Sequence, residues 1–330
     1  NIYIPVDIKQ AVKTGIISKK QAESPKLKNV LQWRLKGGML YKADLAVLSL
    51  LANYKWDRPI YFASIVGMQA NQRLSKYMQG EGMTYKLTPI EYGGNGGTNS
   101  DKMLQLVKGD YELKKADSTT EKVKFLWGNM SQEGVLVDYY TMRMVQNVRL
   151  QLMKLSDELI AENRKEDAIE ILDSTFNFMP IDNEQVPVDD ICFYLCKNYY
   201  EAGDSIKGNK IAEILVNLEL SKLEHYFSFR DEMFERVFNE YGKSLNNIEM
   251  LREASLMSYI SRENMFVPDS TSVIPVSFMP AGILEGTNYK EVLTQAKEKF
   301  DLYKQEKQEF FSKAQKFPVY YTQLWNGGGF

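Results

Sequence analysis

Residues 149–180 constrain the fold more than any other part of the sequence. Apolar residues recur at helical spacing in the first half of this stretch, and a second apolar set recurs in its last half. Asn163 lies between the two sets, where a turn needs a residue that tolerates the left-handed backbone conformation. Pro180 follows the second set, and proline cannot continue a helix. The stretch therefore predicts two antiparallel helices joined by a tight turn.

The order of large and small residues in this stretch resembles the tetratricopeptide repeat, a helical hairpin with a period of about 34 residues. The positions that carry the resemblance are Leu152, Leu155, Ser156, Leu159, Ala168, Leu172, Thr175 and Pro180. A second copy over 189–220 has Cys192, Leu195, Cys196, Tyr199, Gly203, Gly208, Ala212 and Leu215 in the corresponding positions. A third helix pair is predicted over 222–241 and 246–261. Such repeats build binding surfaces and carry no chemistry; an ordinary helical bundle is the alternative.

Length and charge narrow the class of protein. A chain of 330 residues is long enough for two domains, and a net charge of −2 does not favour a nucleic-acid partner. No stretch approaches the roughly 20 apolar residues that cross a bilayer. The two cysteines, Cys192 and Cys196, lie four residues apart on one predicted helix. We expect both to be buried as small apolar residues, because neighbouring helical turns do not suit disulfide geometry.

The residues before the repeats have a different pattern. We expect a buried helix over 42–54, a strand covered on both faces over 59–66, a helix over 71–79 and a half-buried strand over 83–90. Strand, helix and strand in this order predict a small α/β unit with a right-handed crossover. Residues 92–100 lack the spacing of a phosphate-binding loop and predict a surface loop, and 108–120 predict an exposed connection.

The predicted fold is therefore α+β and mostly α. A small α/β domain is expected over 1–140, and a tetratricopeptide-like helical-repeat domain over 141–330. A last amphipathic helix is expected over 289–316, after an extended proline-containing segment over 267–282.

Two motifs in the N-terminal part resemble a known family. The first consists of Trp56, Arg58, Pro59, Ile60, Tyr61, Phe62 and Ala63. The second consists of Leu74, Tyr77, Glu81, Gly82, Tyr85, Leu87, Pro89 and Ile90. Together they resemble the soluble C-terminal region of bacterial multi-pass membrane C-type glycosyltransferases, which are related to the protein O-mannosyltransferase-like transmembrane proteins of animals. The chain departs from the family pattern at Lys86, where arginine is usual, and at Thr88, where valine is usual.

The resemblance implies a role without catalysis for this chain. The family's catalytic residues lie near membrane helices that the sequence does not contain, so none can be assigned here. The parent protein would be a polyprenyl-phosphate-sugar-dependent protein O-glycosyltransferase. This part would lie on the periplasmic, extracytoplasmic side of the inner membrane, tethered by segments outside this chain; the first residue, Asn1 rather than methionine, agrees with that expectation.

The expected partners are a protein or peptide acceptor and the transmembrane domain of the parent protein, with no nucleic acid, metal or cofactor. The motif positions that we expect to contribute to binding are Trp56, Asp57, Arg58, Tyr61, Tyr77, Glu81 and Tyr85. Asp57 and Arg58 could anchor a ligand or form a structural ion pair.

Two other functions remain open from the sequence. One is a stand-alone soluble scaffold of tetratricopeptide repeats for protein–protein interaction. The other is an independent hydrolase that uses Ser64 or the single histidine, His225. Because aromatic residues surround His225 in the sequence, we expect it to be a partly buried packing residue instead. The adjacent Asp189 and Asp190 suit the N-terminus of a helix better than acid/base catalysis.

Overall fold

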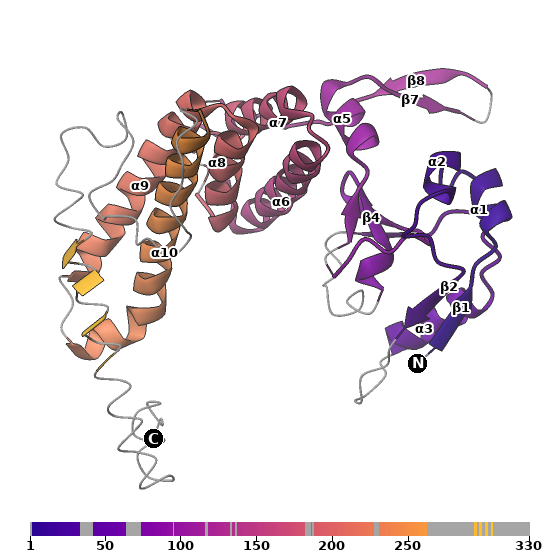
Figure 1. Cartoon of the computed structure of the whole chain (residues 1–330), viewed down its shortest axis with the longest axis horizontal. Coiled ribbons are helices and arrows are strands. Elements are labelled where there is room, and N and C mark those ends of the chain that lie inside the picture. The colour runs from indigo at the N-terminus through magenta and orange to yellow at the C-terminus, as the bar shows by residue number, and fades with distance from the viewer. Residues whose placement is uncertain are drawn as a thin grey trace, which may run out of the picture. The chain divides into compact units, whose positions relative to one another are not determined.

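The structure is a computed structural model, and the fold is α+β and mostly helical, as predicted (Figure 1). It divides into two compact units, residues 1–191 and 192–330. All strands of the described residues lie in the first unit. The domain boundary predicted near residue 140 stays a prediction. The described residues are 2–33, 42–63, 74–94, 96–115, 118–132, 134–135, 137–181, 186, 188–227, 231–262, 294–295, 297–298, 301–302 and 305.

The chain begins with a strand pair that encloses two short helices. Strand β1 (Ile2–Pro5) pairs antiparallel with β2 (Val30–Trp33), and α1 (Ile8–Lys13) and α2 (Lys19–Ala22) lie between them in the sequence. Ser18 and Gln21 form a capping box that begins α2, each side chain accepting from the other's backbone N–H.

A four-stranded sheet follows, in the order β3-β5-β4-β6. The strands are β3 (Tyr61–Ala63), β4 (Met78–Glu81), β5 (Thr84–Leu87) and β6 (Gly97–Thr98). Strand β5 runs antiparallel to both β3 and β4, and β6 runs parallel to β4. The right-handed crossover predicted between the strands of 59–66 and 83–90 is therefore wrong, because β3 and β5 are antiparallel neighbours.

The helix predicted over 71–79 is also wrong in its described part. A single 3-10 turn, η1 (Ser75–Tyr77), leads directly into β4. Leu74, Tyr77 and Met78 are all buried, as a helical face would be. Their spacing fits one 3-10 turn followed by a strand equally well, so periodicity over so few residues does not separate the two structures.

Two elements that we expected to be buried are more exposed. Among the described strands β3 pairs with β5 alone, so it is an edge strand there, and Tyr61 is 44% exposed. The preceding Pro59 agrees with this position, since proline in a strand pattern favours an edge. Helix α3 (Lys42–Ala52) buries Leu51 but leaves Leu45 and Leu50 about half exposed.

Residues 92–100 and 108–120 are more ordered than predicted. Gly97 and Thr98 form β6, and the Asn99 side chain caps α5 (Ser100–Lys108) by accepting from the backbone N–H of Lys102. The predicted connection contains a hairpin of β7 (Tyr111–Lys114) and β8 (Thr120–Val123). Glycine-rich composition indicates a loop but does not exclude a short strand where two backbones approach closely.

The two helices predicted from residues 149–180 are present. Helix α6 (Tyr139–Ala161) packs against α7 (Lys165–Phe178), and Asn163 between them has a φ of 60°, in the left-handed region. Ser156, Ala168 and Thr175 are fully buried, as the close approach of two helices requires.

The second unit consists of helices in its described part. Helix α8 (Asp190–Ala202) is followed by α9 (Ser205–Phe227), and α9 packs against α10 (Asp231–Arg262). Cys192 and Cys196 are buried and are not joined by a disulfide, as predicted. The division predicted near 242–245 is wrong, because α10 continues through it. That these helices form tetratricopeptide repeats stays a prediction, and the expected segments over 267–282 and 289–316 fall almost entirely outside the described residues.

Candidate functional site

Glu81, at the end of β4, collects donors from several elements of the first unit. Its carboxylate forms ion pairs with Lys86 of β5 and with Lys102 of α5, the latter with an Nζ–Oε2 distance of 2.6 Å. Asn99 Nδ2 donates to Oε1 at 2.9 Å, and the Tyr61 hydroxyl donates to Oε2 at 2.9 Å. We call these five residues the Glu81 network. It ties the edge strand β3 and helix α5 to the centre of the sheet.

The network keeps Glu81 ionised. Burial by itself raises the pKa of this carboxyl group, but hydrogen bonds from Lys102, Lys86 and Asn99 outweigh that effect and lower the pKa to about 2. Burial and the neighbouring Glu81 charge raise the pKa of Tyr61, so its hydroxyl remains a donor. A carboxylate held this way is a poor proton donor at neutral pH, because its pKa lies far below the operating pH. The geometry suits positioning rather than acid/base chemistry.

Tyr85 lies on the opposite face of the sheet, since side chains alternate along β5. Its hydroxyl oxygen accepts from Gln151 Nε2 at 2.8 Å and from Lys154 Nζ at 3.2 Å. The Lys154 ammonium group also lies 5.3 Å from the centre of the Tyr85 ring. Through these contacts α6 covers this face of the sheet.

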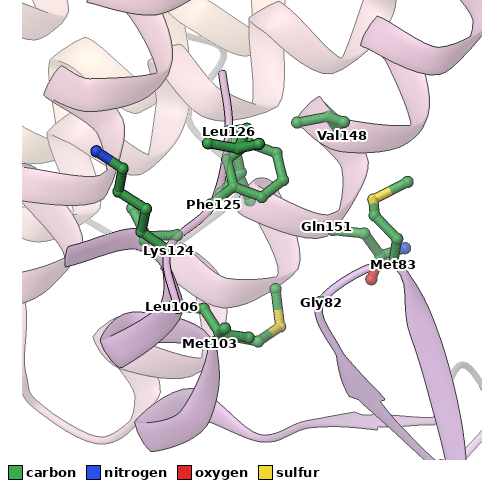
Figure 2. Close-up of a pocket in the computed structure, with 11 residues that line it drawn as sticks. Gly82, Met83, Met103, Leu106, Lys124, Phe125, Leu126, Val148 and Gln151 are labelled. Carbon is green, nitrogen blue, oxygen red and sulfur yellow. The ribbon is translucent and has the colours of Figure 1, made fainter. Parts of the chain in front are cut away.

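An apolar pocket of about 180 Å³ opens between the β4–β5 turn, α5, α6 and the segment after β8. Figure 2 shows Met83 at one side of this space, Met103 and Leu106 below it, and Phe125, Leu126 and Val148 above it. Gly82, with a φ of 67°, makes the tight turn that brings Met83 to the wall. The pocket contains chiefly apolar side chains, so it can take an apolar group of a ligand.

The structure brings together only part of the predicted binding set. Tyr61 and Glu81 are in contact, and Tyr85 lies on the other face of the same sheet. Trp56 and Tyr77 belong to the core: the Trp56 indole donates to the Pro5 carbonyl at 3.0 Å, and the Tyr77 hydroxyl accepts from the Gln32 backbone N–H at 3.1 Å.

Asp57 and Arg58 are exposed, and within the described residues neither forms the ion pair that we considered. Their part in binding stays a prediction, as it does for the other motif positions.

The structure gives no support for a hydrolase site at Ser64 or His225. His225 is exposed on α9, which corrects the expectation of a partly buried histidine; its ring centre lies 6.1 Å from that of Tyr226. Ser64 lies outside the described residues. Among the residues that the structure describes, no group of three or more His, Cys, Asp or Glu could hold a metal ion.

Sequence reasoning missed most of the Glu81 network and the pocket. Lys86 lies in the strand that was predicted to be half-buried, and its side chain is buried opposite Gln79. A buried lysine shows no signal of its own in the sequence; only the strand register places it beside Glu81. The pocket residues come from four separate elements; Gly82 belongs to the second motif and Leu152 to the repeat pattern, and the others belong to neither.

Comparison with known proteins gives a family match over part of the chain. Residues 1–105 match the family described as TMEM260-associated domain 2. The match is compatible with a TMEM260-like, protein O-mannosyltransferase-like domain, and it indicates a glycosyltransferase-associated domain. The matched range contains Glu81, Met83 and Tyr85 but ends before α6. Neither the curated proteins nor the solved structures gave a match. No helix in the described part of the chain has both the length and the apolar character needed to cross a membrane.

Proposed function

We propose that this chain is a non-catalytic, extracytoplasmic part of a membrane-bound glycosyltransferase, where it binds an acceptor protein or another protein partner. The observation that carries the proposal is the match of residues 1–105 to TMEM260-associated domain 2. The motifs that resemble the membrane glycosyltransferases lie inside the matched range.

The site geometry supports binding rather than chemistry. The most buried carboxylate of the matched range, Glu81, is neutralised by two lysines and serves to fix the sheet and α5. Next to it, the β4–β5 turn contributes Met83 to the wall of an apolar pocket. Pockets lined by apolar side chains bind a ligand or partner by burying its apolar surface. The helical pairs add surface on which a polypeptide partner could lie.

The test is the size and location of the native protein in the cells that produce it. An antibody raised against this chain is used on separated membrane and soluble fractions. A membrane band much heavier than the 38.1 kDa of this chain supports the proposal. A soluble band near 38.1 kDa contradicts it.

The alternative is a stand-alone scaffold for protein–protein interaction. The antiparallel pair of α6 and α7, with small buried residues at its contact, favours this function as much as the first. The same fractionation separates the two, because a scaffold of this length would be recovered as a soluble protein of the chain's own mass.

A further inference from the structure

The apolar pocket continues into an exposed stripe on α6. Tyr140, Met144, Val148 and Leu152 are four residues apart, so they lie along one side of the helix. Their exposure decreases along the stripe: Tyr140 is 76% exposed, Met144 is 46% exposed, and Leu152 is buried in the pocket wall. Leu126, which is 79% exposed, borders the pocket from the segment after β8 (Figure 2). We call these five residues and the pocket the α6 groove.

The first unit does not bury the apolar side chains at the exposed end of this stripe. Single exposed apolar residues are common on proteins, but a continuous row of them that leads into a pocket is typical of an interaction site. The same segment is held in place by aromatic contacts: Phe125 packs edge-on against Trp127, and Trp127 stacks on Phe178 of α7, with ring centres 4.9 Å apart in each pair. Leu126 is therefore presented from a fixed support.

The size of the pocket indicates what can enter it. Its volume of about 180 Å³ is smaller than the roughly 300–1,000 Å³ of sites that enclose a whole small-molecule ligand. It is large enough for one bulky apolar side chain, the kind of anchor that dominates protein interfaces. The apolar residues at four-residue spacing on α6 form a ridge, and a second helix can pack its own apolar side chains against such a ridge.

The charged residues beside the groove indicate which charge the partner should carry. Lys124 lines the pocket, and Arg143 precedes Met144 on α6. Among the residues that the structure describes, neither side chain forms an ion pair, whereas nearby Lys108 and Lys122 both do. Two unneutralised cations next to an apolar groove favour acidic residues on the partner.

We infer that the α6 groove binds an amphipathic helix of a partner protein, which inserts one bulky apolar side chain into the pocket and places acidic residues beside Lys124 and Arg143. This inference rests on the proposed function, since it names the surface and the chemistry by which the chain would bind a protein partner. The apolar side chains of the helix, repeated at three- and four-residue intervals, lie along Tyr140, Met144 and Val148.

The test uses the full chain and a phage-displayed library of random 16-residue peptides as the probe. We expect selected peptides to show apolar residues at three- and four-residue spacing together with excess Asp and Glu. Their affinities are then measured as synthetic peptides by fluorescence anisotropy. Leu126→Asp is expected to weaken binding at least about tenfold, because it places a charge at the pocket entrance. The matched control is Ile206→Asp, since Ile206 is similarly exposed (70%) on α9.

The charge requirement is tested separately. Exchange of both Lys124 and Arg143 for Glu is expected to weaken binding about fivefold at low salt, and less at high salt. The control exchanges the exposed Lys9 and Lys20 for Glu, which gives the same change in net charge elsewhere. Circular dichroism and thermal unfolding confirm that each variant is folded.

Three results would overturn the inference. Selected peptides could bind the Leu126→Asp variant as tightly as the parent chain, or they could lack both the apolar spacing and the acidic excess. Sedimentation could instead show a dimer of the parent chain that Leu126→Asp dissociates, which would assign the groove to a second copy. None of these results changes the location of the native protein, so failure of this inference and failure of the proposed function are distinguishable.

Discussion

At the scale of single residues, Glu81 shows how one buried carboxylate determines a local structure. We predict that Glu81→Gln lowers the free energy of unfolding at pH 7 by about 3 kcal/mol, because buried Lys86 loses its counter-ion. The pKa of Glu81 is lowered from its usual 4.5 to about 2 in the folded protein. Its stabilisation is therefore complete above about pH 5 and is lost as the pH falls from there toward 2. Urea unfolding of both proteins at several pH values should show the difference between them narrowing over that range.

The matched control is Glu91→Gln. Glu91 also pairs with two lysines, Lys28 and Lys76, but about a third of each side chain is exposed. Exposed pairs contribute at most about 1 kcal/mol. Equal destabilisation by the two variants would contradict the role assigned to burial at Glu81.

Arg149 is another residue whose charge is buried. Its guanidinium group pairs with Asp189 at 2.9 Å and donates to the Met179 carbonyl at 3.3 Å, and its side chain is 1% exposed. We predict that Arg149→Met lowers the free energy of unfolding by about 3 kcal/mol, since Asp189 loses the buried guanidinium group with which it pairs. Chemical denaturation measures this loss.

The double variant Arg149→Met/Asp189→Asn should recover part of that loss, because it removes the charges of both partners of this ion pair. Arg164→Met serves as the comparison: Arg164 pairs with Asp101 and Asp167, but its side chain is 31% exposed, so a smaller effect is expected. If the double variant is no more stable than the single one, the loss comes from packing and not from charge.

At the scale of elements, the glycine-rich segment before α5 contains positions where a side chain does not fit, and Gly96 is one of them. Gly96 has a φ of 78°, and a Cβ atom there would lie 2.6 Å from the Met78 carbonyl oxygen. Gly96→Ala is predicted to lower the free energy of unfolding by about 2 kcal/mol or more, because β6 would have to move away from β4. At Gly94 a Cβ atom meets nothing within 4 Å, so Gly94→Ala should change stability by less than about 0.5 kcal/mol. Thermal unfolding of the two variants, side by side, gives the comparison.

The elements differ in how far the sequence predicts them. The α6–α7 pair was predictable because it carries a sustained helical period, a turn residue at Asn163 and buried small residues. The helix expected over 71–79 failed because three apolar residues at suitable spacing do not define a period. The hairpin of β7 and β8 was missed because β7 alternates over only four residues and β8 is mostly polar, and the described side chains of both are largely exposed.

The candidate site was predictable in part, for a related reason. Tyr61, Glu81 and Tyr85 were selected from motif positions, and all three lie in the sheet beside the pocket. Lys102 and Gln151, which contact Glu81 and Tyr85, lie far along the chain and belong to no motif. Contacts of this kind follow from tertiary packing, which local patterns do not encode.

At the scale of the whole molecule, the side-chain contacts across residue 140 decide how much of the chain folds together. Gln151 and Lys154 bind the Tyr85 hydroxyl, and Glu162 accepts from Ser100 at 2.9 Å. Two further ion pairs join α5 or its first turn to the start of α7: Arg164 with Asp101, and Lys108 with Asp167. The apolar pocket also takes its walls from both sides of residue 140. These contacts favour a folding unit that extends past the predicted boundary.

We therefore predict different behaviour for two fragments of the chain. A fragment of residues 1–191 retains all of these contacts and should unfold in one cooperative transition. A fragment of residues 1–140 loses α6 and α7, exposes the Tyr85 face of the sheet and the pocket wall, and should unfold at lower denaturant concentration with a shallower transition. Urea unfolding followed by circular dichroism and by tryptophan fluorescence measures both. If the shorter fragment unfolds as cooperatively and at the same midpoint, residue 140 is a true domain boundary and the contacts with α6 and α7 form an interface between domains.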